Sequence, residues 1–416
     1  MPKLTVVFTG SPTERYNPDS GGIQLAELMF CESKVWPGWN KKVIVRGHEK
    51  IKSSSDNVNL IEIYSEDLRL GGLADSVPFS LKASAIIDEL CEKGEDCIHF
   101  TSLIPATIYF DHPIHDYLKN NKRVIKSKFF YTIHNYHYGV SDKPEDVFVN
   151  YPEEWKYLHE AENRVINHVD KVFVPCRRYV DVLSKKFDRE ISYVPNTVGD
   201  LNKYRISTRT SHEYKILLTL SRLEQVKNLE GLLRAFKVAQ THDKKIRLII
   251  GGEGSLLSSL KSICAQSNLR CSQNPCLMNK KSLYSRLDKF DVIFVGKVEG
   301  NDKRFLFEFC DCVALFSFRE ICSLFGLEAI AYGKRILASK IPGWQDYKDC
   351  GCDIMLCNPY KIKEMADTIL EGTVNIKEKS YTISKKNKEI YQKYYSPEIV
   401  STIRYSLYEN SLRSNL

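Results

Sequence analysis

Short apolar runs of strand length alternate with amphipathic stretches along nearly the whole chain. A first series of apolar runs comprises Leu4–Thr9, Lys42–Arg46, Asn59–Tyr64, Cys97–Thr101, Phe129–His134, Lys171–Pro175 and Ile191–Pro195. A second series comprises Lys215–Leu220, Arg247–Gly251, Val292–Val295, Cys312–Ser317, Arg335–Ser339 and Asp353–Cys357. Because βαβ units alternate in this way, we predict an α/β fold with parallel sheets that helices cover on both faces.

The length of the chain predicts two domains. Its 416 residues exceed the about 250 to 300 at which a single hydrophobic core usually stops growing. The segment Thr197–Tyr214 is polar and has no sustained period, so we place the linker there. We expect an N-terminal domain over residues 1–200 and a C-terminal domain over residues 201–390. Ligands of such sheets bind at the carboxyl ends of the strands, which predicts a cleft between the domains.

Composition argues against a membrane-spanning or disulfide-rich protein. No window approaches the about 20 uncharged apolar residues of a membrane span, and Met1–Phe8 is too short for a signal peptide. The 13 cysteines are scattered, which suits a reducing compartment. None of their clusters has the pair spacing of a structural zinc site, so we expect buried free thiols and no metal. These features predict a soluble, cytoplasmic protein.

Positive charge is concentrated in one segment. The net charge is +8, and Lys119–Lys128 carries five cations in ten residues. A solvated helix end and loop would explain this segment, and so would peripheral contact with anionic lipid or with a phosphorylated acceptor. No recognised nucleic-acid-binding motif accompanies the charge, so we expect no nucleic-acid partner.

Two carboxylates, Glu320 and Glu328, flank a segment that joins a predicted strand to a predicted helix. The apolar run Cys312–Ser317 precedes the segment, and the helix is expected over residues 328–333 with Gly333 closing it. A loop that enters a helix presents free backbone N–H groups and the positive end of the helix dipole, which favours a phosphate-bearing ligand. Taken alone, the two carboxylates are more typical of a solvated loop and helix face than of a ligand site.

Other charged or flexible residues follow earlier predicted strands. Arg222 and Lys227 leave the predicted strand Lys215–Leu220 and could clamp a diphosphate, although solvated surface charges would look the same. Gly22 follows the first strand and would allow the backbone close to an anion. His134 ends another strand, where a histidine is usually structural.

In their order along the chain, these patterns resemble the motifs of the retaining, GT-B-fold glycosyltransferases of family 4, also called glycosyltransferase group 1. The segments that carry the resemblance are Phe129–His134, Val194–Asp200, Ser221–Asn228, Ile249–Gly254, Val292–Val298, Glu320–Gly333 and Pro342–Asp346. The resemblance implies two Rossmann-like domains that face a central cleft. It also implies that the C-terminal helix, about residues 391–416, crosses back to the first domain.

The resemblance implies a metal-independent glycosyltransferase without a cofactor. Such an enzyme would move a hexose or an N-acetylhexosamine from a nucleotide sugar to a hydroxyl acceptor, with retention of configuration. A UDP-sugar is the expected donor, and GDP-mannose is the second choice. The acceptor, which could be a glycan, a lipid-linked molecule or a protein, is not identified, and Asn135–Pro144 is either an acceptor-binding segment or an ordinary surface loop.

The resemblance also implies a role for each candidate site residue. Arg222 and Lys227 would hold the diphosphate of the donor, Glu320 would hold the sugar, and Glu328 would accept from the ribose hydroxyls. His134 would reach the sugar from the opposite domain. Further donor contacts are expected at Gly22, Gly252, Val298, Cys322, Ser323 and Leu324.

One position departs from the family pattern. When the segment is aligned on Glu320 and Glu328, Ser323 stands where the family usually has glycine. A Cβ atom at this position would narrow the loop around the sugar, so Ser323 is expected to influence the choice of donor.

Two alternatives remain open. A nucleotide-sugar epimerase on the same fold would release a free sugar without an acceptor. A non-catalytic scaffold or partner subunit would keep the fold and lose the site, but Arg222, Lys227 and Glu320 are all present.

Overall fold

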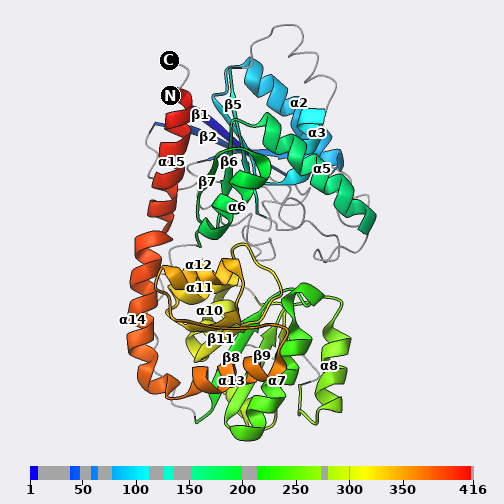
Figure 1. Cartoon of the computed structure of the whole chain (residues 1–416), viewed down its shortest axis with the longest axis vertical. Coiled ribbons are helices and arrows are strands. Elements are labelled where there is room, and N and C mark those ends of the chain that lie inside the picture. The colour runs from blue at the N-terminus through cyan, green and yellow to red at the C-terminus, as the bar shows by residue number, and fades with distance from the viewer. Residues whose placement is uncertain are drawn as a thin grey trace. The chain divides into compact units, whose positions relative to one another are not determined.

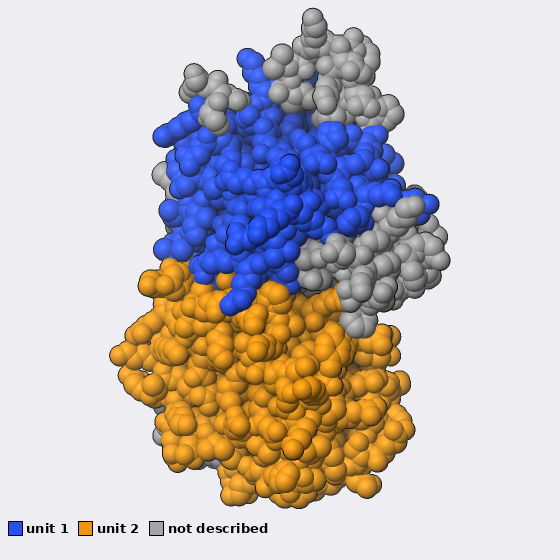
Figure 2. Space-filling view, viewed as in Figure 1, with its two compact units in different colours: residues 1–199, 395–416 blue, residues 200–394 orange. Residues whose placement is uncertain are grey.

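The structure is a computed structural model (Figure 1) that describes residues 1–7, 38–46, 58–63, 77–111, 126–134, 152–198, 213–272, 280–298 and 300–413. The chain divides into two compact units (Figure 2). Unit 1 comprises Met1–Gly199 and Tyr395–Leu416, and unit 2 comprises Asp200–Tyr394. Three sequence predictions lie wholly or mostly outside the described residues: those for Gly22, for Asn135–Pro144 and for Lys119–Lys128.

Within the described residues, unit 1 contains a seven-stranded sheet in the order β3-β2-β1-β4-β5-β6-β7, and every pairing is parallel. The strands are β1 (Lys3–Val7), β2 (Asn40–Arg46), β3 (Asn59–Ile63), β4 (Cys97–Phe100), β5 (Lys128–Thr132), β6 (Lys171–Val174) and β7 (Ile191–Tyr193). The helices are α2 (Val77–Glu92), α3 (Leu103–Asp111), α5 (Pro152–His168), α6 (Arg177–Phe187) and α15 (Pro397–Arg413).

Helix α15, red in Figure 1, joins the core of unit 1 although it ends the chain. The hydroxyl of its fully buried Tyr408 lies 2.5 Å from Nδ1 of His99 on β4. The ring of Tyr408 meets Phe130 of β5 edge to face, with centroids 4.6 Å apart. Burial of an aromatic ring with its hydroxyl bonded stabilises the packing of α15 on this sheet.

Within the described residues, unit 2 contains a six-stranded sheet in the order β10-β9-β8-β11-β12-β13, again with parallel pairings throughout. The strands are β8 (Lys215–Leu220), β9 (Ile246–Gly251), β10 (Val292–Gly296), β11 (Cys312–Leu315), β12 (Arg335–Ser339) and β13 (Ile354–Cys357). The helical elements are η5 (Gln225–Lys227), α7 (Leu229–His242), α8 (Leu257–Gln266), α9 (Lys280–Leu287), α10 (Gly300–Phe309), α11 (Leu324–Ala331), α12 (Pro342–Asp349), α13 (Ile362–Thr373) and α14 (Ile376–Tyr394).

The predicted α/β fold with parallel sheets is confirmed, and each predicted strand is found within a few residues of its expected bounds. The strands were predictable because helices cover both faces of these sheets, so the strands form nearly continuous apolar runs. The prediction for the helix after β11 was wrong at its start. This helix begins at Leu324 and not at Glu328.

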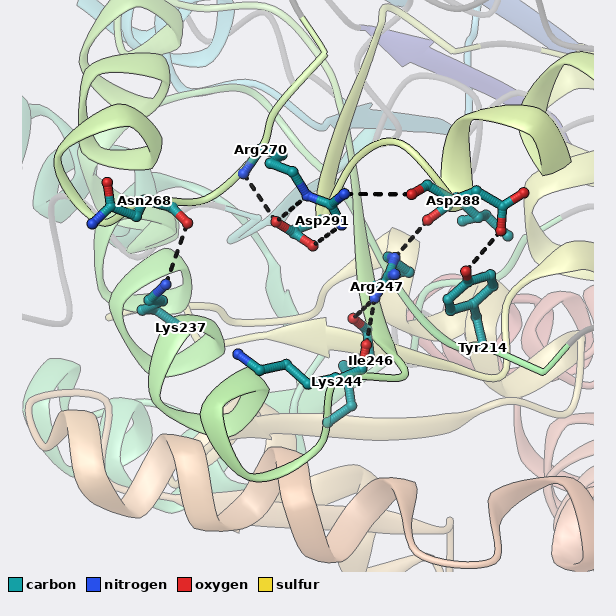
Figure 3. A network of polar contacts seen from close by, with 10 residues as sticks. Tyr214, Lys237, Lys244, Ile246, Arg247, Asn268, Arg270, Asp288 and Asp291 are labelled. Carbon is teal, nitrogen blue, oxygen red and sulfur yellow. Dashed lines mark hydrogen bonds and ion pairs between the residues drawn. The ribbon is translucent and has the colours of Figure 1, made fainter.

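A network of polar contacts joins the amino-terminal ends of β8, β9 and β10 (Figure 3). Arg247 of β9 is 5% exposed, donates to the carbonyl oxygen of Leu287 at 2.7 Å and lies over the ring of Tyr214 at 4.2 Å. Arg270 donates to both carboxylate oxygens of Asp291, at 3.2 and 2.9 Å. Because ligands of open α/β sheets bind at the carboxyl ends of the strands, we assign this network to stability.

Candidate functional site

The strand order of unit 2 reverses between β8 and β11. From β8 the chain proceeds outward to β9 and β10, whereas β11, β12 and β13 follow on the other side of β8. Loops that leave two neighbouring strands at such a reversal diverge and leave room for a ligand at the carboxyl edge of the sheet. The loops here are Ser221–Asn228, after β8, and Phe316–Ser323, after β11.

The structure brings together two of the predicted site residues at this reversal. Nζ of Lys227 donates to Oε1 of Glu320 at 2.6 Å, and the two side chains are 19% and 13% exposed. The hydroxyl of Ser317 lies 3.3 Å from the same carboxylate oxygen. A partly buried ammonium and carboxylate, both near the surface, can hold the charged and hydroxyl groups of a polar ligand.

Backbone and amide contacts hold the two loops together. The backbone N–H of Phe318 donates to the carbonyl oxygen of Val226 at 2.9 Å. Asn228, 7% exposed, has a left-handed backbone with φ +50 and donates from its amide to the carbonyl oxygens of Phe316 and Pro359, each at 3.0 Å. Asparagine tolerates this conformation better than most residues do. The left-handed turn at Asn228 thus ends η5 immediately after Lys227 and fixes the position of that lysine.

Two glycines let the turn after β9 approach the loop after β8. Gly252 has φ +128, and a Cβ atom there would overlap the carbonyl oxygen of Ser221. Gly254 has φ +154, and a Cβ atom there would lie 2.5 Å from the carbonyl oxygen of Leu223. The structure therefore gives Gly252 a packing role, and its predicted contact with a donor stays a prediction.

Arg222 is oriented differently from Lys227. Its side chain is 68% exposed and forms an ion pair with Glu224, two residues along the chain. In the described part of the structure, Lys227 pairs with Glu320, so the two cations have different carboxylate partners. The prediction that both cations clamp one diphosphate remains a prediction.

Ser323 begins helix α11. Its hydroxyl accepts from the backbone N–H of Gly326 at 3.2 Å, and the residue is 8% exposed. This N-cap explains why the helix begins four residues before Glu328. The predicted donor contacts Cys322 and Leu324 flank the cap, so their backbone N–H groups lie at the positive end of the helix dipole.

Helix α12 supports the segment that carries Glu320. A Cβ atom at Gly343 would lie 2.5 Å from the carbonyl oxygen of Glu320 and 2.7 Å from that of Ile321, so only glycine fits. Sγ of Cys322 lies 2.8 Å from the hydroxyl of Tyr347. No sequence motif indicated this support, although Gly343 lies in the Pro-Gly pair that begins the segment Pro342–Asp346.

Glu328 lies in the second turn of α11 and is paired with a residue that sequence analysis missed. Nζ of Lys303, on α10, lies 2.6 Å from Oε1 of Glu328. The two side chains are 31% and 15% exposed. No sequence motif pointed to Lys303, because the contact depends on how two helices pack.

The remaining predicted residues lie at other strand ends. Val298 follows β10, and its side chain covers the backbone of Gly251 at the end of β9, where an added Cβ atom would lie 3.0 Å from it. His134 follows β5 in unit 1 and is half-buried. Its predicted contact with the sugar of a donor stays a prediction.

The cysteines and the acidic residues show no sign of a metal centre in the described ranges. The described cysteines are free thiols, and no group of three or more His, Cys, Asp or Glu side chains is arranged to hold a metal ion there. Burial raises the pKa of the Cys310 thiol to about 12.

None of the helices in the described part of the chain combines the length and apolar character that a membrane crossing requires.

The chain has two parallel, Rossmann-like sheets, and the candidate site lies at the strand reversal of the second sheet. This α/β architecture matches solved structures of GT-B fold. The sequence model of the family Glycosyl transferases group 1 matches residues 202–389. Unit 2 is therefore similar to this family over most of its length.

Individual proteins show the same similarity. An uncharacterized glycosyltransferase of Methanocaldococcus jannaschii is 26% identical over 195 residues, which cover 46% of this chain and 44% of that protein. The chain spans about half the length of the curated relatives it matches.

Sucrose-phosphate synthase from Thermosynechococcus elongatus superposes with a TM-score of 0.71 at 14% identity, over 100% of both chains. HepE from Anabaena, solved with UDP and glucose, has a TM-score of 0.62 at 16% identity, over 98% of this chain and 99% of that chain. At these identities the two structures show a shared fold.

Proposed function

We propose that this protein is a retaining, metal-independent glycosyltransferase that uses a nucleotide sugar and needs no cofactor. It would move a hexose or an N-acetylhexosamine to a hydroxyl acceptor. The observation that carries the proposal is the Lys227–Glu320 pair at 2.6 Å, at the carboxyl edge of unit 2 where the strand order reverses. A UDP-sugar is the favoured donor, which the UDP bound to HepE supports, and GDP-mannose is the second choice.

In this proposal, Lys227 faces the diphosphate of the donor and stabilises the negative charge that builds up as the nucleotide leaves. Arg222, exposed on the same loop, adds positive charge when its side chain turns from Glu224 to the phosphates. The backbone N–H groups at the start of α11 contribute further, because they lie at the positive end of a helix.

Glu320 accepts hydrogen bonds from hydroxyls of the transferred sugar, and Glu328 accepts from the ribose. The anomeric carbon breaks its bond to the terminal phosphate oxygen and forms one to the acceptor oxygen. The proton of the acceptor hydroxyl passes to the departing phosphate, so no other base is required. The aligned donor and acceptor provide most of the rate enhancement through proximity and charge stabilisation.

The test uses the full chain with UDP-glucose, UDP-galactose, UDP-N-acetylglucosamine and GDP-mannose, and it measures release of UDP or GDP. We expect release with at least one donor and thermal stabilisation by the matching nucleotide. A protein that releases no nucleotide and is stabilised by none would contradict the proposal and favour the scaffold. Nucleotide release that yields a free epimerised sugar as the sole product would favour the epimerase.

A matched pair of lysine variants tests the site itself. Lys227→Met removes the cation at the carboxyl end of β8, and Lys215→Met removes one at its amino end, where Lys215 pairs with Asp243 at 2.7 Å. We expect Lys227→Met to lower nucleotide release by about 100-fold or more and Lys215→Met to change it less than about twofold. Equal effects of the two variants would contradict the assignment of Lys227.

A further inference from the structure

The Lys303–Glu328 ion pair lies at a helix contact that aromatic rings hold together. The ring of Phe307 on α10 lies 5.3 Å from that of Phe325 on α11 and stacks at 4.5 Å on Tyr332, the residue directly after α11. Phe307 is fully buried. Lys303 is one helical turn before Phe307 on α10. Glu328 is three residues after Phe325 on α11 and four before Tyr332, so it lies on the side of α11 that faces Phe307. The packed rings therefore set the distance between the ammonium and the carboxylate.

The pair is close to the edge of the sheet at which the proposed donor binds. Lys303 lies in the first turn of α10, which follows the carboxyl end of β10, and Glu328 lies in the second turn of α11, which follows β11. The side chain of Glu328 is 15% exposed, so a ligand can reach it. Oε1 bonds to Lys303, and a carboxylate has a second oxygen that can accept from a hydroxyl.

We propose that Lys303 is a positioning residue that holds the carboxylate of Glu328 in place for the ribose of a nucleoside diphosphate, and so makes the site select for ribose hydroxyls. This inference rests on the proposed function. A glutamate side chain that has to be ordered on binding lowers the affinity, by about 3- to 10-fold. The Lys303 ammonium orders the carboxylate before the ligand arrives, and that cost is largely removed.

The test measures the affinity of the full chain for UDP and for 2′,3′-dideoxyuridine 5′-diphosphate, by calorimetry. The dideoxy compound keeps the base and the diphosphate and lacks both ribose hydroxyls. We expect the wild-type protein to bind UDP at least about 10-fold more tightly than the dideoxy compound, because a hydrogen bond to a charged group contributes that much. In Lys303→Met we expect UDP affinity to fall about 3- to 10-fold and the preference for UDP to fall to about threefold or less.

Three further variants separate positioning from a merely structural effect. Arg304→Met removes a neighbouring cation with the same 31% exposure, which pairs with Glu308, and it should leave the preference unchanged. Lys303→Arg keeps a cation at the same position and should retain most of the preference. Glu328→Ala should abolish the preference, and Lys303→Met should then have no added effect. If Lys303→Met does not fold, Lys303→Gln replaces it with a neutral donor of similar length and should lower the preference.

The outcomes distinguish this inference from the proposed function. The wild-type protein could prefer UDP to the dideoxy compound, and Lys303→Met and Lys303→Gln could show the same preference. The positioning role is then overturned, and the proposed function stands. If the preference falls equally in Arg304→Met, the effect is structural and the inference is again overturned. If wild-type protein binds neither UDP nor GDP, both the inference and the proposed function fail.

Discussion

The ammonium of Lys227 and the carboxylate of Glu320 lie 2.6 Å apart although 93 residues separate them in the chain. Each follows a different strand, and the parallel pairing of β8 with β11 brings the two loops to one edge of the sheet. The two charges therefore neutralise one another. In the proposed function, a donor would have to share or displace this contact when its diphosphate and sugar bind.

Replacement of Glu320 by glutamine tests this shared contact. Glu320→Gln leaves the Lys227 charge without its carboxylate, so we expect the affinity for UDP, which lacks a sugar, to stay level or to rise. The rate of nucleotide release from the sugar donor should fall at least about 10-fold, because the sugar loses its charged acceptor. Calorimetry measures the affinity for UDP, and a release assay measures the rate of nucleotide release from the sugar donor. A large loss of UDP affinity would contradict this division of roles.

The turn at Gly252 provides a prediction for stability. Gly252→Ala combines a left-handed φ of +128 with overlap of the Ser221 carbonyl oxygen, so we expect it to cost more than about 3 kcal/mol of unfolding free energy. Gly300→Ala is the control, because its φ is +48 and no atom of the described residues lies within 4 Å of the added Cβ atom. It should cost about 1 to 2 kcal/mol. Urea denaturation of both variants gives the comparison, and similar costs would contradict it.

Two variants of Ser323 separate its capping role from its predicted effect on the donor. Ser323→Ala keeps the Cβ atom but loses the hydrogen bond from the backbone N–H of Gly326. It should lower the free energy of unfolding by about 1 kcal/mol and leave the donor preference unchanged. Glycine is tolerated at an N-cap, so Ser323→Gly should lower the free energy of unfolding by only about a few tenths of a kcal/mol. It should raise release from UDP-N-acetylglucosamine relative to UDP-glucose several-fold, because the loop widens. Unchanged donor ratios in both variants would refute the predicted effect on donor choice.

Asp291 makes stability depend on pH. Burial by itself raises the pKa of this carboxyl, but the hydrogen bonds from Arg270 outweigh burial and hold its pKa below the ordinary value of 3.8. A carboxyl with a lowered folded pKa contributes stability that is present above its unfolded pKa and is lost as the pH falls through the folded pKa. We therefore expect the wild-type protein to lose this contribution below about pH 4.

The variant Asp291→Asn should lower the free energy of unfolding by about 1 kcal/mol at pH 7. It should also make the loss of stability at acid pH less steep than in the wild-type protein. Asp367→Asn, an exposed position on α13, is the control and should change stability little. Thermal melts between about pH 3 and pH 7 provide the measurement. Parallel acid profiles for wild-type protein and Asp291→Asn would count against the role of this pair.

The packing of α15 supplies the last prediction. Tyr408→Phe removes the buried hydroxyl that lies 2.5 Å from His99 while keeping the ring contacts, so it should destabilise unit 1 by about 1 to 2 kcal/mol. Tyr381→Phe removes a hydroxyl that is exposed on α14, where the residue is 74% exposed, and should have almost no effect. Hydrogen exchange of β4 and β5 reports the difference. Equal protection in the two variants would show that the hydroxyl contributes nothing.

The amino-acid sequence by itself determined the strands, their parallel arrangement and the loops that carry charge. Apolar runs such as Lys215–Leu220 and Cys312–Ser317 are local patterns, and burial on both faces makes them easy to recognise. The sequence also placed Lys227 and Glu320 after their strands, because parallel strands end at one edge of a sheet.

Only the tertiary structure decided which of these side chains meet. Lys227 pairs with Glu320 while Arg222 pairs with Glu224, and Glu328 finds Lys303 across a contact of two helices. Such pairs depend on the order of the strands and on how the rings between α10 and α11 pack, which are relations between distant segments. Periodicity along the chain carries no information about them, because it records which face of an element is buried and not what covers that face.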